Sequence, residues 1–391
     1  MRDLVFGKVG RLWQTSVPVL ALALVAMQPV QAQTFTVLYT FTGGPDGGTP
    51  LATPTIYEGS VYGTTSGGGA YANGAVYALN FKTRVETVLH SFTGKPDGAD
   101  PVAGLVQDSS GNFYGVAYRG GAENFGTMFE VTPAGAFTLL YSFSNPATEG
   151  CGPSGTLVMD ASGNLYGTTY FGGANNEGRG TAFEYSDSVY TTLKNFAPGG
   201  PLPRAGLHLQ ASKLYGTTSG DDNELVGGAV FEVGVVAPLY TFTGGPDGGQ
   251  PLGALIGNSQ GNLYGTTSAG GNGSFGSGNG VVFQVNIASG QETVLHTFTG
   301  SPDGSVPASA LAWDALGNLY GTTTLGGAYG FGTVFELSPS GTMTILHSFT
   351  GGSDGATPYA GVEVDNAGNV WGAASSGGSG YGTLFVISPA K

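Results

Sequence analysis

Leu319-Tyr320-Gly321-Thr322-Thr323 is the clearest copy of a pentapeptide that recurs along this chain in the same or a closely related form. Its aromatic position returns about every 50 residues, a length typical of one supersecondary unit in a repeat protein. Seven residues occupy that position: Tyr62, Tyr114, Tyr166, Tyr215, Tyr264, Tyr320 and Trp371. Seven such copies along the chain predict a repeat architecture.

Each repeat resembles four short strands in sequence. In the sixth copy, residues 310–313, 319–323, 332–337 and 344–349 are rich in β-branched and aromatic side chains. Clusters of Gly, Pro, Asn and Asp separate these runs, which is typical of tight turns between antiparallel strands. We therefore expect an all-β fold made of four-stranded sheets. The recurring aromatic residues should lie in the core, and the recurring Thr pairs should serve the strand ladders.

The phase of the repeat at its two ends predicts how the sheets are arranged. Residues 35–41 match a fourth strand without the first three, and residues 382–388 match a third strand without a fourth. The two pieces together make one complete sheet, so a ring can close without an open edge. The prediction is a seven-bladed β-propeller closed by the N-terminal strand, a single domain over residues 33–391. A β-helix is the weaker alternative, because its coils are usually much shorter.

The first 32 residues differ in character from the repeats. A basic leader precedes the apolar run 17–27, and Val30-Gln31-Ala32 places small or apolar residues at a cleavage position. The apolar run is too short to cross a bilayer, so it predicts a secretory signal peptide that is removed after Ala32. No second long apolar stretch follows, and we expect no membrane span. The predicted location is secreted or extracellular, with the periplasm as an alternative.

Composition excludes some classes of partner. The chain carries a formal net charge of −14 at pH 7 and 72 glycines. A nucleic-acid-binding groove needs clustered positive charge, which this composition does not supply. Cys151 is the single cysteine, so no disulfide can form within the chain. We expect a monomer that is held together by side-chain packing and backbone ladders.

The repeat resembles a known family. Residues 314–323, 332–337 and 344–355 carry the motifs LYGTT, GG, GTVF and FTG-x-x-DG, which resemble the GloVer tandem repeat of secreted bacterial proteins. The resemblance extends over residues 35–391. The turn Asp-x-x-Gly-Asn before the second strand is also similar to that of NHL and streptogramin-lyase-like propellers. The resemblance implies a propeller fold and brings no established reaction with it.

The strand order predicts which rim could bind a ligand. Loops between strands two and three, and between one blade and the next, share one rim and are long and Gly-rich, and functional residues usually lie on such loops. Departures from the repeat in the second to fourth copies supply the candidate ligand-binding residues Tyr118, Arg119, Tyr170, Glu177, Arg179, Arg204 and Asp222. Such side chains on neighbouring blades suit a carbohydrate or an acidic polymer. Drift in a tolerant repeat explains the same pattern.

Two recurring polar positions have a structural explanation. One series of loop aspartates could bind Ca²⁺ as a ring, but Gly-Pro-Asp-Gly is a turn in which Asp caps its own backbone, and turn chemistry is the favoured interpretation. The series comprises Asp46, Asp97, Asp247, Asp303 and Asp354. His90, His296 and His347 occupy one position in different repeats and cannot converge on one ion. We expect no metal site and no cofactor, with Ca²⁺ as the alternative.

The function predicted from these features is binding. The sequence contains no nucleophile elbow, phosphate-binding loop or zinc-ligand spacing. This favours a non-enzymatic binding or surface-interaction module, whose partner would be an extracellular polysaccharide or a surface protein. The alternative is a polysaccharide lyase or glycoside hydrolase at the loop-rich face. It would use Tyr, Arg and His side chains for β-elimination, or Glu149 and Glu177 as a carboxylate pair.

Overall fold

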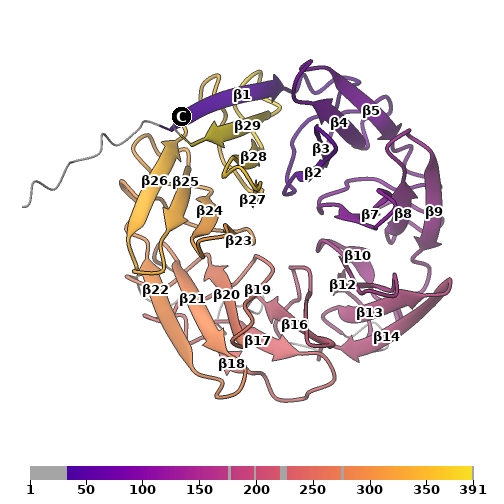
Figure 1. Cartoon of the computed structure of the whole chain (residues 1–391). Helices are drawn as coiled ribbons and strands as arrows, with labels where there is room; N and C mark the ends of the chain where they lie inside the picture. Colours follow the sequence, from indigo (N-terminus) through magenta and orange to yellow (C-terminus); the bar gives the residue numbers. More distant parts are fainter. Residues whose placement is uncertain (1–32, 175–177, 198–199, 221–226, 274–276, 390–391) are drawn as a thin grey trace, which may run out of the picture.

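Seven antiparallel sheets stand around a common axis (Figure 1). The computed structural model describes residues 33–174, 178–197, 200–220, 227–273 and 277–389, so the predicted signal peptide lies outside the described residues. The described residues contain no helix, and thus no helix that could cross a membrane. The predicted all-β, seven-bladed propeller is confirmed.

The blades follow one another in chain order. Blade 1 comprises β2 (Thr55–Tyr57), β3 (Ser60–Thr65), β4 (Ala75–Asn80) and β5 (Glu86–Ser91). Blade 2 comprises β6 (Val106–Gln107), β7 (Phe113–Ala117), β8 (Thr127–Val131) and β9 (Phe137–Ser142). Blade 3 comprises β10 (Cys151–Pro153), β11 (Val158–Met159), β12 (Leu165–Phe171), β13 (Thr181–Ser186) and β14 (Val189–Asn195). Blade 4 comprises β15 (His208–Gln210), β16 (Lys213–Thr218), β17 (Ala229–Glu232) and β18 (Tyr240–Thr241).

The remaining three blades complete the ring. Blade 5 comprises β19 (Ile256–Gly257), β20 (Asn262–Thr267), β21 (Val281–Asn286) and β22 (Glu292–Thr297). Blade 6 comprises β23 (Ala312–Trp313), β24 (Leu319–Thr323), β25 (Thr333–Leu337) and β26 (Met343–Ser348). Blade 7 comprises β27 (Val362–Val364), β28 (Val370–Ala374), β29 (Thr383–Ser388) and β1 (Thr34–Thr40).

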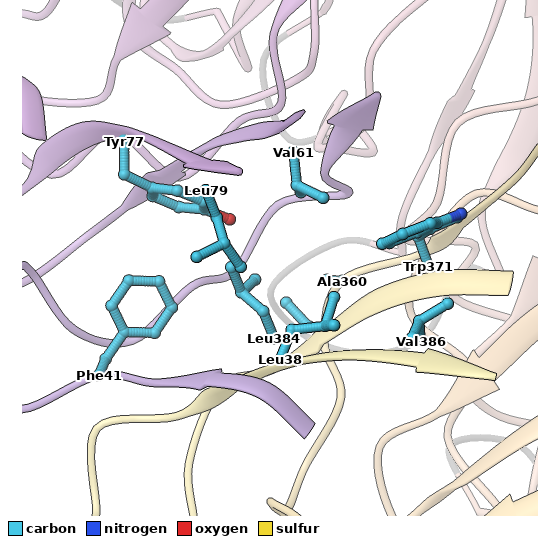
Figure 2. Close-up of a cluster of buried hydrophobic side chains, with 10 residues drawn as sticks. Leu38, Phe41, Val61, Tyr77, Leu79, Ala360, Trp371, Leu384 and Val386 are labelled. Carbon is cyan, nitrogen blue, oxygen red and sulfur yellow. The ribbon is translucent and has the colours of Figure 1, made fainter. Parts of the chain in front are cut away.

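The N-terminal strand closes the ring. β1 pairs antiparallel with β29, from Thr34 opposite Ser388 to Thr40 opposite Thr383. Figure 2 shows Leu38 of β1, and Phe41 just after it, packed together with side chains from the other strands of blade 7 and from blade 1. The Phe41 ring lies edge-on to the Tyr77 ring of blade 1, with centroids 5.2 Å apart. The predicted closure by the N-terminal strand is therefore confirmed.

Each blade repeats one core contact. The ring of Phe335 in the third strand of blade 6 lies directly over Gly321 in the second strand, where a Cβ would be 2.6 Å from Cζ. The same glycine–aromatic contact recurs in the other blades, as Gly63–Tyr77, Gly115–Phe129, Gly167–Phe183, Gly216–Phe231, Gly265–Phe283 and Gly372–Phe385. The aromatic residue of the pentapeptide is core as predicted. Only Tyr114 and Tyr166 of this series are half-buried rather than buried.

Threonines of the pentapeptide join neighbouring blades. The first Thr donates its hydroxyl to a backbone carbonyl of the next blade, at 2.8 to 3.1 Å. The pairs are Thr64 to Ala103, Thr168 to Ala205, Thr217 to Gly253, Thr266 to Ser309, and Thr322 to Ala360. These threonines belong to the scaffold, as predicted, although they bond the next blade rather than their own ladder. They hold the segments that precede each first strand close to the axis.

The recurring histidines and aspartates hold the loops between blades. His90 contacts the Asp97 carboxylate at 2.9 Å, and the same carboxylate accepts hydrogen bonds from the backbone and hydroxyl of Thr93. His296 with Asp303 and His347 with Asp354 repeat the arrangement. These observations confirm that the aspartates serve turns and the histidines serve the scaffold. Among the residues that the structure describes, no group of three His, Cys, Asp or Glu could hold a metal ion.

Candidate functional site

A funnel opens on the loop-rich face of the propeller, around its axis. Its volume is about 560 Å³. All seven blades contribute an inner segment, which we define as a proline and the four residues that follow it (50–54, 101–105, 153–157, 203–207, 251–255, 307–311 and 358–362). Most of these lining residues are Ala, Gly, Ser or Thr. Small side chains leave the axis open at this end, so a ligand-sized cavity is available.

Two tyrosines enter the funnel from neighbouring blades. Tyr118 directly follows β7 in blade 2, Tyr170 lies near the end of β12 in blade 3, and their ring centroids are 6.4 Å apart. In the other five blades this position holds a Ser or Thr whose hydroxyl donates to the backbone carbonyl just before the inner segment. Those five residues are Ser66, Ser219, Ser268, Thr324 and Ser375. Blades 2 and 3 thus lack a scaffold hydrogen bond and present an aromatic ring instead.

The backbone beside Tyr118 is adapted to its ring. Gly152, just before the inner segment of blade 3, has a φ of 65°, and a Cβ there would lie 2.8 Å from the Tyr118 ring. Five other blades keep a positive φ at this position with residues other than glycine, such as Gln250 and Val306. The backbone conformation alone therefore does not require glycine. Glycine is required instead by the close approach of the Tyr118 ring, because any larger residue at position 152 would clash with it.

Arg204 brings a positive charge to the same side of the funnel. It lies in the inner segment of blade 4, where its backbone carbonyl accepts a hydrogen bond from Ser154 at 3.2 Å. Its guanidinium carbon lies 4.9 Å from the centroid of the Tyr170 ring, a distance typical of a cation–π contact. Arg204 is exposed. Residues from blades 2, 3 and 4 thus form one aromatic and cationic wall.

Of the other predicted site residues, the two that the structure describes lie outside this wall. Arg119 does not line the funnel; its guanidinium carbon lies 5.8 Å from the centroid of the Tyr118 ring, and its Nε lies 3.6 Å from Oδ2 of Asp100. Arg179 pairs with Gly172 in a parallel bridge and is absent from the described lining of the funnel. Glu177 and Asp222 lie outside the described residues. The structure brings Tyr118, Tyr170 and Arg204 together in the lining of the funnel, which does not include Arg119 or Arg179.

Sequence reasoning missed the inner segments and one of their aromatic residues. Tyr359 lines the funnel from blade 7 and is 49% exposed. It occupies the position after the proline, which is Arg204 in blade 4 and apolar Leu51, Val102 or Leu252 in other blades. An alignment of the seven segments on their prolines would have shown both unusual residues.

Exposed aromatic side chains gather on the funnel face. In the described part of the chain, all six of them belong to its loops or to the strand ends that lead into these loops: Tyr71, Phe171, Tyr329, Phe331, Tyr359 and Tyr381. The opposite rim exposes aliphatic residues such as Val236 and Leu316. The two faces of the propeller therefore differ in chemistry. Exposed aromatic rings are enriched where proteins bind their ligands.

The described lining of the funnel holds neither a carboxylate nor an imidazole group. Glu149, half of the proposed carboxylate pair, accepts hydrogen bonds from the backbone of Ser144 and Asn145 at 3.0 and 3.3 Å. This carboxylate therefore shapes its own loop. What the described wall offers is stacking on Tyr rings, backbone hydrogen bonds and one cation, which together suit recognition of a polar ligand.

The fold and the funnel define a closed seven-bladed β-propeller with a ligand-sized cavity on one face. The chain belongs to the Gloeobacter/Verrucomicrobia repeat family, whose model matches residues 23–231 and again residues 213–391. This bears out the resemblance noted in the repeat motifs. No curated protein matches the sequence.

Solved propellers share the architecture at low sequence identity. An oligogalacturonate lyase in complex with manganese has a TM-score of 0.55 at 12% identity, covering 92% of this chain and 96% of its own. The extracellular domain of a hybrid two-component system from B. thetaiotaomicron gives 0.57 at 10% identity, covering 91% and 41%. A chain of the mitotic checkpoint complex gives 0.54 at 12% identity, covering 99% and 98%. Such likeness shows the fold alone.

Proposed function

We propose that this protein is a secreted module that binds carbohydrate in the funnel on its loop-rich face. The observation that carries the proposal is the pair Tyr118 and Tyr170. Five blades use a hydroxyl at this position to bond their own backbone, and two neighbouring blades replace it with rings that face one cavity. Departures from a repeated scaffold feature are expected at functional sites, and this departure occurs in two neighbouring blades.

The chemistry of the wall favours a sugar. The apolar face of a sugar ring packs on aromatic side chains, while its hydroxyl groups bond to backbone and small polar groups. Tyr118, Tyr170 and Tyr359 supply the rings, and the Gly, Ser and Thr residues of the inner segments keep backbone groups accessible. A cavity of about 560 Å³ is of a size that suits a short stretch of polysaccharide or an oligosaccharide. The leader at residues 1–32 supports export to where such polymers occur.

A glycan array tests this function. The parent protein is compared with a reversion variant, Tyr118→Ser with Tyr170→Ser, which restores the residue found in blades 1, 4, 5 and 7. Tyr71→Ala is the matched control, because Tyr71 is exposed on the same face but outside the funnel. We expect the parent and the control to retain the same glycans and the reversion variant to lose them. Equal binding by all three proteins would contradict the proposal.

The enzymatic alternative is decided by the same glycans. Each one retained on the array is incubated with the parent protein, and the mixture is analysed for shortened or unsaturated products. We expect binding without turnover, because the described lining has neither a carboxylate nor an imidazole group to serve as a general base. Product formation that the reversion variant loses would assign a lyase or hydrolase to the same funnel.

A further inference from the structure

The charge of the funnel is opposite to that of the protein. The chain has a formal net charge of −14. Arg204 is nevertheless the single charged side chain among the described residues that line the funnel. Within the described residues, no acidic side chain lies at ion-pair distance from Arg204, whereas Arg119 is paired with Asp100. A cation with no counter-charge at a cavity mouth attracts an anionic group.

The position of the guanidinium suits it to this task. It lies over the Tyr170 ring, and stacking of this kind leaves the N–H groups in the plane of the guanidinium free to donate. The bond from Ser154 to its backbone carbonyl holds the inner segment in place. A planar fork of donors matches the oxygens of a carboxylate or a sulfate ester. The Tyr118 ring lies alongside, so one sugar could contact both the rings and the cation.

We propose that the funnel recognises an acidic sugar, in which one carboxylate or sulfate ester pairs with Arg204 while the sugar ring packs on Tyr118 and Tyr170. This inference rests on the proposed carbohydrate binding and adds the class of ligand. The carboxylate and the sulfate ester both present negatively charged oxygens that can accept hydrogen bonds from Arg204. Neutral glycans of the same shape would bind through the rings alone.

Calorimetric titration with matched sugars tests the inference. One pair is trigalacturonate and its carboxyl-reduced counterpart, and the other is a sulfated galactose trisaccharide and its desulfated counterpart. We expect at least one acidic sugar to bind about ten- to a hundredfold more tightly than its neutral partner, because charge-assisted hydrogen bonds are the stronger ones. The pair that shows the preference distinguishes carboxylate from sulfate. Rising salt should reduce the preference.

Variants at two cations complete the test. Arg204→Gln should remove the preference by weakening binding of the acidic sugar until it approaches that of its neutral counterpart, and Arg204→Lys should keep part of it. Lys95→Gln is the matched control, since Lys95 is exposed on the same face and does not line the funnel. Equal binding of acidic and neutral sugars by the parent, or an undiminished preference in Arg204→Gln, would overturn this inference and leave the proposed function standing. No binding by any of the four sugars would count against both.

Discussion

The glycine of the repeated pentapeptide, which has no side chain, leaves room for the aromatic ring that the third strand places over it. At Gly321, a Cβ would lie 2.6 Å from Cζ of Phe335 and 2.8 Å from Leu311. Phe335 is fully buried, so its ring has no free space to move into. The glycine recurs because the aromatic ring above it recurs.

The first prediction follows from this contact. Gly321→Ala should lower the free energy of unfolding by about 1–3 kcal/mol, the usual effect of forcing extra volume into a packed core. Gly67→Ala serves as its control, because a Cβ there meets nothing closer than 3.7 Å. Chemical denaturation of the two variants makes the comparison. A Gly321→Ala protein as stable as the Gly67→Ala protein would refute the packing explanation.

The second prediction concerns Asp303, which is 9% exposed. Burial acts to raise the pKa of this carboxyl, but hydrogen bonds from Thr299 and His296 leave it below its usual value. A lowered pKa in the folded state stabilises the protein above the unfolded pKa, and this contribution is lost as the pH falls through the folded pKa. Asp303→Ala should therefore cost about 1–3 kcal/mol at neutral pH.

Thermal melts at pH 7 and at about pH 3 test the Asp303 prediction. The melting temperatures of the parent and of Asp303→Ala should differ clearly at pH 7 and become similar in acid. A constant difference across this range would show that the carboxylate charge contributes nothing.

At the scale of elements, the junction between blades 7 and 1 contains a titratable bond. Glu363 in β27 accepts a hydrogen bond from the backbone N–H of Ile56 in β2 at 3.1 Å. Burial raises the pKa of Glu363 to about 7. The protonated form is thus favoured in the folded state, and its stabilising contribution is present below the unfolded pKa and lost as the pH rises through about 7.

The third prediction is a pH-dependent effect of Glu363→Gln. The amide keeps an acceptor for Ile56 and cannot ionise, so the variant should match the parent at pH 5. At pH 8 it should be more stable by about 2 kcal/mol, because the parent then buries a charge. Thermal melts at the two pH values provide the measurement. A variant that is destabilised equally at both would show that the carboxylate is needed in its charged form.

The elements differ in how far their sequence predicted them. Strands two, three and four carry repeated motifs such as 319–323 and 332–337, and these lie in strands as expected. The inner segments lack a distinctive sequence motif, because small residues of several types all leave the axis open. Tyr118, Tyr170 and Arg204 were found as departures from the repeat. Their assembly into one wall depends on blade geometry, which spacing along the chain does not encode.

For the whole molecule, closure of the ring depends on one strand from the opposite end of the chain. β1 supplies the outer strand of blade 7, and Leu38 with Phe41 fills the junction to blade 1. Without it, β29 would present unpaired backbone groups along a free edge, and such edges promote aggregation.

The fourth prediction concerns this closure. A chain that starts at residue 42 should melt at a lower temperature and aggregate more readily than one that starts at residue 33. Leu38→Asp in the longer chain keeps the strand but places a charge in the junction, and it should destabilise the protein by several kcal/mol, on the order expected for an unpaired buried charge. Equal melting temperatures for the two chains would argue against closure by β1.

Paired melting and titration of the Tyr118→Ser, Tyr170→Ser variant test most directly the proposal that blades 2 and 3 carry ligand-binding rings in place of scaffold hydroxyls. Serine regains the hydrogen bond made in the other blades, so the melting temperature should stay equal or rise. Affinity for the glycan retained by the parent should fall at least about tenfold, as expected when interface aromatic rings are removed. A lower melting temperature with unchanged affinity would show that the two tyrosines are structural, and would contradict their proposed role in ligand binding.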